Sequence, residues 1–353
     1  MVLGLGLALL LLLQACGASS SSEKPRVTVL LWDKTAGYLN WGFEWFRKAA
    51  ETKCSTRCVV SEDKGIVQTA DMVLFHAPTH VSVPGGNSKR AGAVYAMLSM
   101  EQPKYARFLS DLQYLKRHFD LLATYSQADF YPGTTVPNLP LSYFPLNILT
   151  PASVLQPARP FASKTGLDSG VSVAIFTSNC HAAGASQRYQ YIEELSKLIK
   201  VHSYGKCHKN ADEPSMPEDP QWPAPAQRRA RKVKVLSHYK FYLAFENLAV
   251  DDYVSEKVFE GLFAGAVPVY RGAKQISQFM PGNDSFINAN DMSPAQLAEL
   301  LLRLKDDEDA YGHYMTFKNR PLPASFNEVA LRSYTHPNVL CRLCAFALEH
   351  RGK

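Results

Sequence analysis

A dense group of side chains able to do chemistry lies in residues 245–257, FENLAVDDYVSEK, which follow a predicted strand and open a predicted helix. A helix N-terminus presents free backbone N–H groups and the positive end of the helix dipole, so it favours a phosphate. Lys257 adds a point charge there, and Glu256 offers hydrogen-bond acceptors for sugar hydroxyls. Asn247 both donates and accepts, and Tyr253 adds a flat face with a polar tip. The segment is a candidate site for a phosphate next to a sugar, although a helix start carrying Glu and Lys is also common without such a role.

A second group ends an earlier predicted strand. Ser178, Asn179, Cys180 and His181 follow that strand, and Arg188 opens the helix after it. In a doubly wound sheet both strand ends face one crevice, so the two groups are expected to meet. An arginine there grips a diphosphate with two parallel hydrogen bonds. The alternative for Arg188 is an ordinary surface charge.

A histidine pair, His76 and His80 in FHAPTH, follows another predicted strand. The spacing resembles a metal pair on a helix, but Pro78 between them argues against a helix. We expect these side chains to line the ligand cleft rather than to bind a metal.

Length and composition bound the class of protein. The chain has 353 residues, 46% hydrophobic and 20% charged, which excludes disordered and collagen-like classes and favours two domains. The net charge of +6 is too small and dispersed for a nucleic-acid surface and suits a protein that holds a small anion. The basic run at residues 228–232 is expected to be a solvated surface insertion.

Strands that alternate with helices predict two α/β blocks with parallel sheets. In the first block we expect strands at 27–32, 70–76, 93–100 and 120–125, and helices near 40–50 and 104–119. In the second we expect strands at 171–178, 200–204, 239–246 and 267–270, and helices at 187–200 and, with Ser255 as N-cap, at 256–264. Residues 132–160 contain seven prolines and are expected to form a linker. This pattern predicts two facing Rossmann-like domains with a ligand in the cleft between them.

The N-terminal segment suggests entry into the secretory pathway. Residues 2–13, VLGLGLALLLLL, are too short to span a bilayer comfortably and fit the apolar core of a signal peptide. A cleaved signal, a short signal anchor and a truncated gene model all stay open. In that compartment Asn283 begins an N-glycosylation sequon, Asn283-Asp284-Ser285.

The seven cysteines agree with an oxidising compartment. Six of them fall into three pairs that are expected to be structural disulfides, namely Cys54–Cys58, Cys180–Cys207 and Cys341–Cys344, with Cys16 left in the targeting segment. A zinc site is an alternative with poor ligand spacing, and a redox CxxC is not expected near a chain end.

The segment KFYLAFEN followed by DYVSEK closely resembles the signature of the α1,3-fucosyltransferases, glycosyltransferase family 10. The resemblance continues through residues 265–269, 284–287, 178–179, 203–205 and the terminal CRLC, and it covers about residues 170–345. SNC, SYGKCH and CRLC look most like the plant-type core enzymes, which fucosylate the innermost GlcNAc of N-glycans.

This resemblance implies an inverting, GDP-fucose-dependent transferase of GT-B architecture. It divides the chain into a targeting segment with a Ser-rich stalk (1–22), an acceptor-binding domain (25–150), a Pro-rich linker (151–169) and a GDP-fucose-binding domain (170–345). The general base matches Glu101 in Ser99-Met100-Glu101. The donor-binding residues that it implies are Arg188, Asn247, Tyr253, Glu256, Lys257, Ser178, Asn179 and Tyr204.

Further expectations follow from the resemblance. Asp251-Asp252 is not a spaced DxD motif, so cationic side chains are expected to replace an obligatory metal, with stimulation by divalent cations left open. The expected partner is the N-glycan of a glycoprotein in the Golgi lumen, reached by a type II membrane protein or its cleaved form, with no nucleic acid. Lewis-type fucosylation of N-acetyllactosamine is the alternative reaction, and a non-catalytic glycan-binding protein is the alternative class.

Overall fold

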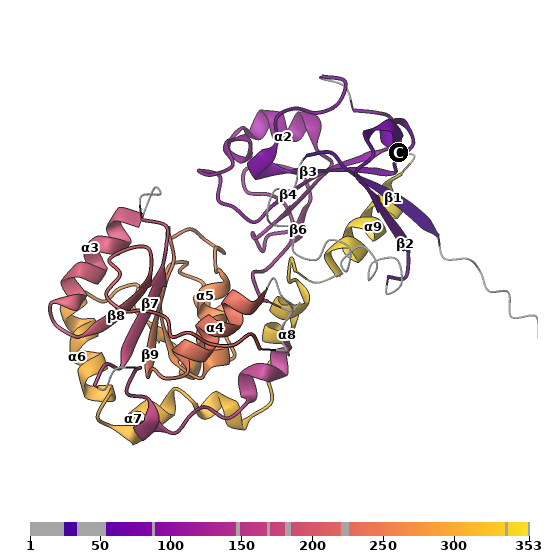
Figure 1. Ribbon diagram of the computed structural model, residues 1–353. Coiled ribbons are helices and arrows are strands. Elements are labelled where there is room, and N and C mark those ends of the chain that lie inside the picture. The colour runs from indigo at the N-terminus through magenta and orange to yellow at the C-terminus, as the bar shows by residue number, and fades with distance from the viewer. Residues whose placement is uncertain are drawn as a thin grey trace, which may run out of the picture.

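The computed structural model describes residues 25–33, 54–86, 89–145, 149–167, 170–180, 185–219, 226–335 and 338–351. They form two α/β domains, which Figure 1 shows as separate lobes joined by crossing segments. The predicted N-terminal segment at 1–22 and the predicted helix near 40–50 lie outside the described residues.

The first domain is a parallel sheet in the order β2-β1-β3-β4-β5-β6. Its strands are β1 (Arg26–Leu31), β2 (Arg57–Ser61), β3 (Met72–His76), β4 (Val94–Ser99), β5 (Leu121–Thr124) and β6 (Asn138–Pro140). The four predicted strands are confirmed, and β2 and β6 are additions. The helix expected over 104–119 is shorter: after a 3-10 turn, α2 (Leu112–His118) begins where Asp111 accepts a hydrogen bond from the Tyr114 N–H.

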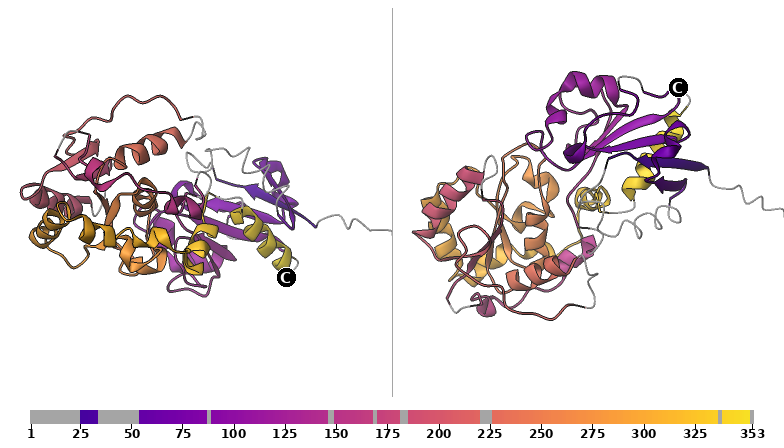
Figure 2. Two further views of the ribbon diagram at one scale, coloured as in Figure 1. Left: turned by 90° about the horizontal axis from the view of Figure 1, so that it is seen from below. Right: turned by 45° about the horizontal axis from the view of Figure 1, so that its top comes forward.

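The second domain is a parallel sheet in the order β11-β10-β9-β7-β8. Its strands are β7 (Val173–Thr177), β8 (Val201–Gly205), β9 (Phe241–Phe245), β10 (Val267–Arg271) and β11 (Ile287–Asn288), so all four predicted strands are confirmed. The helices α3 (Ala185–Ser196) and α6 (Pro294–Leu304) pack on one face, and α4 (Gln227–Leu236) and α5 (Glu256–Ala264) pack on the other. The views in Figures 1 and 2 show these two helical layers. Two further helices, α7 (Glu308–His313) and α8 (Ala324–Leu331), follow α6.

The C-terminal helix α9 (Asn338–His350) returns to the first domain (Figure 1). Its buried residues, Leu340 and Leu343 among them, join the core formed by β1 and β2. The predicted boundary of a second domain running to residue 345 is therefore wrong at its end, because the last helix belongs to the first core.

Two disulfides attach α9 to the segment around β2. Cys54 bonds to Cys341 and Cys58 bonds to Cys344, with Cα–Cα distances of 5.1 and 6.0 Å. The predicted pairs Cys54–Cys58 and Cys341–Cys344 are wrong. Cys341 and Cys344 are one turn apart on α9, so both side chains lie on the helix face that packs against the β2 segment. Each therefore bonds to a different cysteine of that segment. The predicted Cys180–Cys207 bond is present, with a Cα–Cα distance of 5.5 Å.

The described residues of the predicted Pro-rich linker belong to the two domains. Within 132–160, β6 completes the first sheet, and the 3-10 helix Pro151–Leu155 packs against α5. Lys164 is fully buried, and its Nζ donates hydrogen bonds to the carbonyl of Gly265 and to the hydroxyl of Tyr311. Residues 151–167 are thus part of the second domain. Over the residues that the structure describes, we find no helix with the length and apolar character needed to cross a bilayer.

Candidate functional site

A pocket of about 420 Å³ opens at the carboxyl edge of the second sheet. Segments that follow β9, β10 and β11 line it together with the start of α3. Its lining residues are Gln187, Arg188, Phe245, Glu246, Asn247, Leu248, Ala249, Arg271, Gly272, Lys274, Asn288, Asn290 and Asp291. Strand ends at this edge are the usual ligand position of a doubly wound sheet, and the prediction that Arg188 and Asn247 meet is confirmed.

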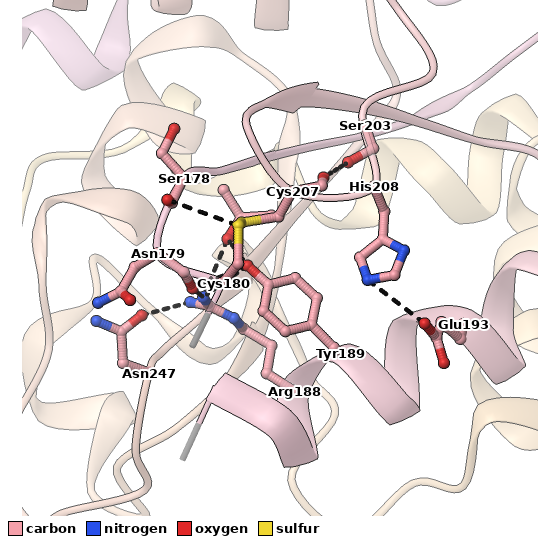
Figure 3. The surroundings of a disulfide bond; sticks show 11 residues. Ser178, Asn179, Cys180, Arg188, Tyr189, Glu193, Ser203, Cys207, His208 and Asn247 are labelled. Carbon is pink, nitrogen blue, oxygen red and sulfur yellow. Dashed lines mark hydrogen bonds and ion pairs between the residues drawn. A yellow bond between two sulfur atoms is a disulfide. The ribbon is translucent and has the colours of Figure 1, made fainter. Parts of the chain in front are cut away.

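Arg188 is buried in this wall, with 5% of its surface exposed. Its guanidinium donates to Oδ1 of Asn247 at 2.5 Å, to Oγ1 of Thr177 at 3.0 Å and to the carbonyls of Asn179 and Phe245 at 3.0 and 3.3 Å. Figure 3 shows the Asn179 and Asn247 contacts beside the Cys180–Cys207 disulfide. These acceptors and a fifth, the Tyr189 hydroxyl at 3.4 Å, are neutral, and Nε is buried without a hydrogen-bond partner among the described residues. A buried cation surrounded by neutral acceptors favours an anion as its counter-charge.

Glu246, which sequence reasoning missed, organises the start of α5. Its side chain is fully buried and accepts hydrogen bonds from the Ser255 N–H at 2.7 Å and from Lys257 Nζ at 3.2 Å. Ser255 is the N-cap residue as predicted, and its own N–H donates to the Glu246 carboxylate. The protein itself therefore takes up one of the N–H groups that we expected a phosphate to use. The signal for Glu246 was its position between β9 and Asn247.

Lys257 and Glu256 form a charged pair at this helix start, 3.6 Å apart. Burial alone would raise the pKa of Glu256, but Lys257, Lys232 and Arg229 outweigh it and lower that pKa to about 2. Burial opposes the charge of Lys257, yet Glu246 and Glu256 together raise its pKa. Both side chains are consequently charged near neutral pH.

The basic run at 228–232 is not a solvated insertion, contrary to the prediction. It lies in α4, where Arg229 and Lys232 contact Glu260 of α5 at 2.9 and 2.6 Å. The Glu260 side chain is only 3% exposed. These two cations also lower the pKa of the Glu256 carboxylate, so α4 stabilises the negative charge at the start of α5.

Tyr253 joins the second domain to the first. Its ring packs against Tyr125 and Tyr143 of the first domain, with centroids 5.2 and 5.7 Å apart. Burial, together with the nearby carboxylates of Glu246 and Glu101, raises its pKa well above the ordinary range. Tyr253 is therefore neutral and sits at the domain contact rather than in the pocket lining.

Glu101 stands on the first-domain side of that contact. It follows β4 and is half-buried, and its backbone N–H donates to Ser99 Oγ at 3.1 Å. Burial is the main cause that raises the pKa of Tyr125 and of Tyr253, and the charge of Glu101 adds to it in both. The structure thus puts Glu101 on one domain, with Arg188 and Lys257 on the other.

The remaining predicted residues take several positions. Ser178 and Asn179 are exposed at the end of β7, and the Asn179 carbonyl holds Arg188. Tyr204 is 1% exposed and stacks on Phe176 in the second core, outside the pocket lining. Asn283 is exposed at the start of a short 3-10 helix, and its glycosylation stays a prediction.

The histidine pair is buried in the first domain. His80 contacts Asp33 through Nδ1 at 3.0 Å and the Tyr114 hydroxyl through Nε2 at 2.8 Å, and His76 contacts Thr79 at 2.9 Å. Both His80 ring nitrogens are therefore engaged by protein side chains. Within the described parts of the chain, no group of three or more His, Cys, Asp or Glu side chains has the geometry of a metal site.

Two other missed residues belong to the pocket. Arg271, at the end of β10, donates to the carbonyls of Ala289 and Asn290, and Asn290 Oδ1 accepts from the Gly272 N–H. Lys274 is exposed at the rim. Ligands bind beyond the carboxyl ends of the strands in such a sheet, and this applies to β10 as well as to β9. The strand end at 271–272 could therefore have indicated Arg271 and Lys274 from the sequence.

Two Rossmann-like domains, with a cation-lined pocket at the edge of the second sheet, define a GT-B glycosyltransferase fold. A family model described as glycosyltransferase family 10 (fucosyltransferase) C-term matches residues 168–353, and one described as fucosyltransferase, N-terminal matches residues 24–131. The chain belongs to glycosyltransferase family 10, the fucosyltransferases.

Curated relatives are longer than this chain, which spans about half their length or less. Alpha-(1,3)-fucosyltransferase B of Drosophila melanogaster is 33% identical over 66% of the chain and 50% of its own length. A fucosyltransferase-like protein of Arabidopsis thaliana is 29% identical over 83% of the chain and 48% of its own length. GDP-fucose protein O-fucosyltransferase 3 of Homo sapiens is 33% identical over 57% and 39%.

Solved structures share the fold. A crystal structure of an α1,3-fucosyltransferase with GDP superposes with a TM-score of 0.59 at 14% identity and covers 96% of both chains. One with GDP-fucose gives 0.57 at 15% identity, over 95% of this chain and 93% of that one. At such identity the match concerns the architecture.

Proposed function

We propose that this protein transfers fucose from GDP-fucose to an acceptor hydroxyl, with inversion at the anomeric carbon. The observation that carries the proposal is the buried Arg188 guanidinium, held by neutral acceptors in the wall of a pocket at the sheet edge. Family membership supports GDP-fucose as the donor.

On the donor side, Arg188 and Lys257 would supply the positive charges that stabilise the leaving diphosphate. As the bond from the anomeric carbon to GDP breaks, the leaving diphosphate gains negative charge, which preorganised cations stabilise strongly. The carboxylate of Glu256 accepts hydrogen bonds from sugar hydroxyls, and Asn247, bonded to Arg188, holds the guanidinium in orientation.

On the acceptor side, Glu101 would be the general base. The acceptor oxygen forms a bond to the anomeric carbon on the face opposite to GDP, and the hydroxyl proton passes to the Glu101 carboxylate. A base on one domain and a leaving-group site on the other suits this in-line arrangement. The step balances: the acceptor hydroxyl loses its proton to Glu101, and the electron pair of the broken bond between the anomeric carbon and GDP leaves with GDP.

The acceptor we propose is the innermost GlcNAc of an N-glycan core, in α1,3 linkage. The segments SNC, SYGKCH and CRLC support the core acceptor, and the relative named Alpha-(1,3)-fucosyltransferase B supports the linkage. A second candidate is a protein hydroxyl, because relatives named GDP-fucose protein O-fucosyltransferase 3 are 33% identical to this chain.

Three acceptors assayed in parallel with GDP-fucose decide between these reactions. They are a GlcNAc-terminated biantennary glycopeptide, free N-acetyllactosamine and an unglycosylated protein substrate, with GDP release and product mass as readouts. We expect fucose on the core GlcNAc of the glycopeptide. Transfer to N-acetyllactosamine alone, or to the protein alone, would overturn the core acceptor and keep the donor chemistry.

The proposed compartment is the Golgi lumen. The three disulfides suit an oxidising environment, and the apolar segment at residues 2–13 suits entry into the secretory pathway, as a signal or as a membrane anchor. Exposed Asn283 would then be available for glycosylation. Digestion with an N-glycosidase of protein from a secretory host should lower its mass, and an unchanged Asn283 peptide would contradict this.

A further inference from the structure

The loop between β9 and α5 contains a residue in an unusual backbone conformation. Asp252 has φ of 62°, and among the described residues His208 is the only other non-glycine with positive φ. This left-handed region disfavours most side chains, whereas Asn and Asp tolerate it. The position therefore admits Asp, Asn or Gly and disfavours most other residues.

The carboxylate of Asp252 crosses to the other domain. Its Oδ2 accepts a hydrogen bond from the backbone N–H of Gln127 at 2.8 Å. Gln127 follows β5 in the first domain. Asp252 thus has both the left-handed backbone conformation and the interdomain hydrogen bond. It precedes Tyr253, whose ring packs against first-domain tyrosines.

Gln127 is a firm anchor for this bond. Its side-chain amide donates to the carbonyls of Tyr125 and Leu141 at 2.8 and 2.9 Å, and its side-chain oxygen accepts from Arg332 at 2.7 Å. Because three hydrogen bonds fix the side chain, the N–H that faces Asp252 has a defined position.

We propose that Asp252 is a positioning residue: through its bond to Gln127 it sets the separation between Glu101 on the first domain and the donor pocket on the second. The inference rests on the proposed fucosyl transfer. A base and a leaving-group site on different domains react well only at the correct spacing, and a displacement of about 1 Å costs up to about 100-fold in rate. The GDP-binding wall around Arg188 belongs to the second domain, so it does not depend on this bond.

Two substitutions separate the carboxylate from the backbone conformation. Asp252→Gly accepts the positive φ and removes the hydrogen-bond acceptor, while Asp252→Asn accepts the positive φ and retains a side-chain oxygen. For D252G we expect kcat at least about 10-fold lower, with the Kd for GDP within about 2-fold of wild type. D252N should recover most of the lost kcat, which a mere loss of stability in D252G would not explain.

Hydrogen exchange at the Gln127 amide reports the bond without any need for activity. We expect faster exchange at Gln127 in D252G and near-normal exchange in D252N. Wild-type kcat in D252G, unchanged exchange at Gln127, or an equal loss of GDP affinity would each overturn the proposal. If the wild-type protein transfers no fucose to any acceptor, the proposed function fails, and the exchange measurement still shows whether the interdomain bond exists.

Discussion

Arg188 donates a hydrogen bond to the side-chain oxygen of Asn247 at 2.5 Å, across 59 residues of sequence. The two come from adjacent strand ends, Arg188 from the helix after β7 and Asn247 from the loop after β9. This contact joins the two polar groups that the sequence presents separately. It also leaves the arginine with neutral partners, so that its charge is available to a diphosphate.

Replacement of Arg188 should therefore weaken GDP binding. Arg188→Lys keeps a charge but loses the planar guanidinium and its Nε–H, the donor that the protein leaves without a partner among the described residues. We expect the Kd for GDP to rise at least about 10-fold, the effect of losing one hydrogen bond to a charged group. Isothermal titration calorimetry measures it, with exposed Arg228→Lys on α4 as the matched control. An unchanged Kd in Arg188→Lys would remove the residue from the donor site.

The two disulfides between α9 and the β2 segment should show strongly non-additive effects. Each closes a loop of nearly 290 residues, but once one bond exists the second closes only a short ring. The loop-entropy relation then gives about 2 kcal/mol for removing either bond and about 8 kcal/mol for removing both, because the long loop alone accounts for about 6 kcal/mol. Chemical denaturation of Cys54→Ser/Cys341→Ser, of Cys58→Ser/Cys344→Ser and of the quadruple serine variant measures this. Simple additivity of the two losses would argue against the relation.

The sequence could predict the alternating elements and the sheet-edge site, since strand ends converge by topology. It could not predict the partners of the two disulfides on α9 or the return of that helix, because both depend on contacts between segments almost 290 residues apart. Local spacing favoured Cys54–Cys58, although four residues near a strand separate the cysteines too far when extended. The basic run in α4 was misread for the same reason, since its partner Glu260 lies on another helix.

Glu256 should make stability depend on acid pH. Its folded-state pKa of about 2 lies below the ordinary value of 4.5. The carboxylate therefore contributes stability above pH 4.5 that is lost as pH falls through about 2, up to about 3 kcal/mol at about 1.4 kcal/mol per unit. Denaturation of Glu256→Gln at several acid pH values should show a shallower decline than wild type, with exposed Glu299→Gln as control. Equal slopes for all three proteins would contradict this.

Glu246 shows what pattern reasoning leaves out in the site itself. Its neighbours Phe245 and Asn247 mark a strand end, but nothing in the letters shows that its carboxylate turns toward Ser255 and Lys257. Side-chain direction depends on the packing around the start of α5. For the same reason the sequence did not show that Tyr204, which lies near a strand end, is buried in the core of the second domain.

In the proposed mechanism the first domain supplies the general base and the second domain binds GDP. Glu101→Gln, assayed for turnover and for GDP binding on the same preparation, tests this most directly. The substitution removes the proposed base and leaves the pocket around Arg188 untouched. We predict kcat at least about 100-fold lower, the low end for losing one general base, with the Kd for GDP unchanged. Near-normal turnover with the best acceptor would contradict the account, because the proton would then have another destination.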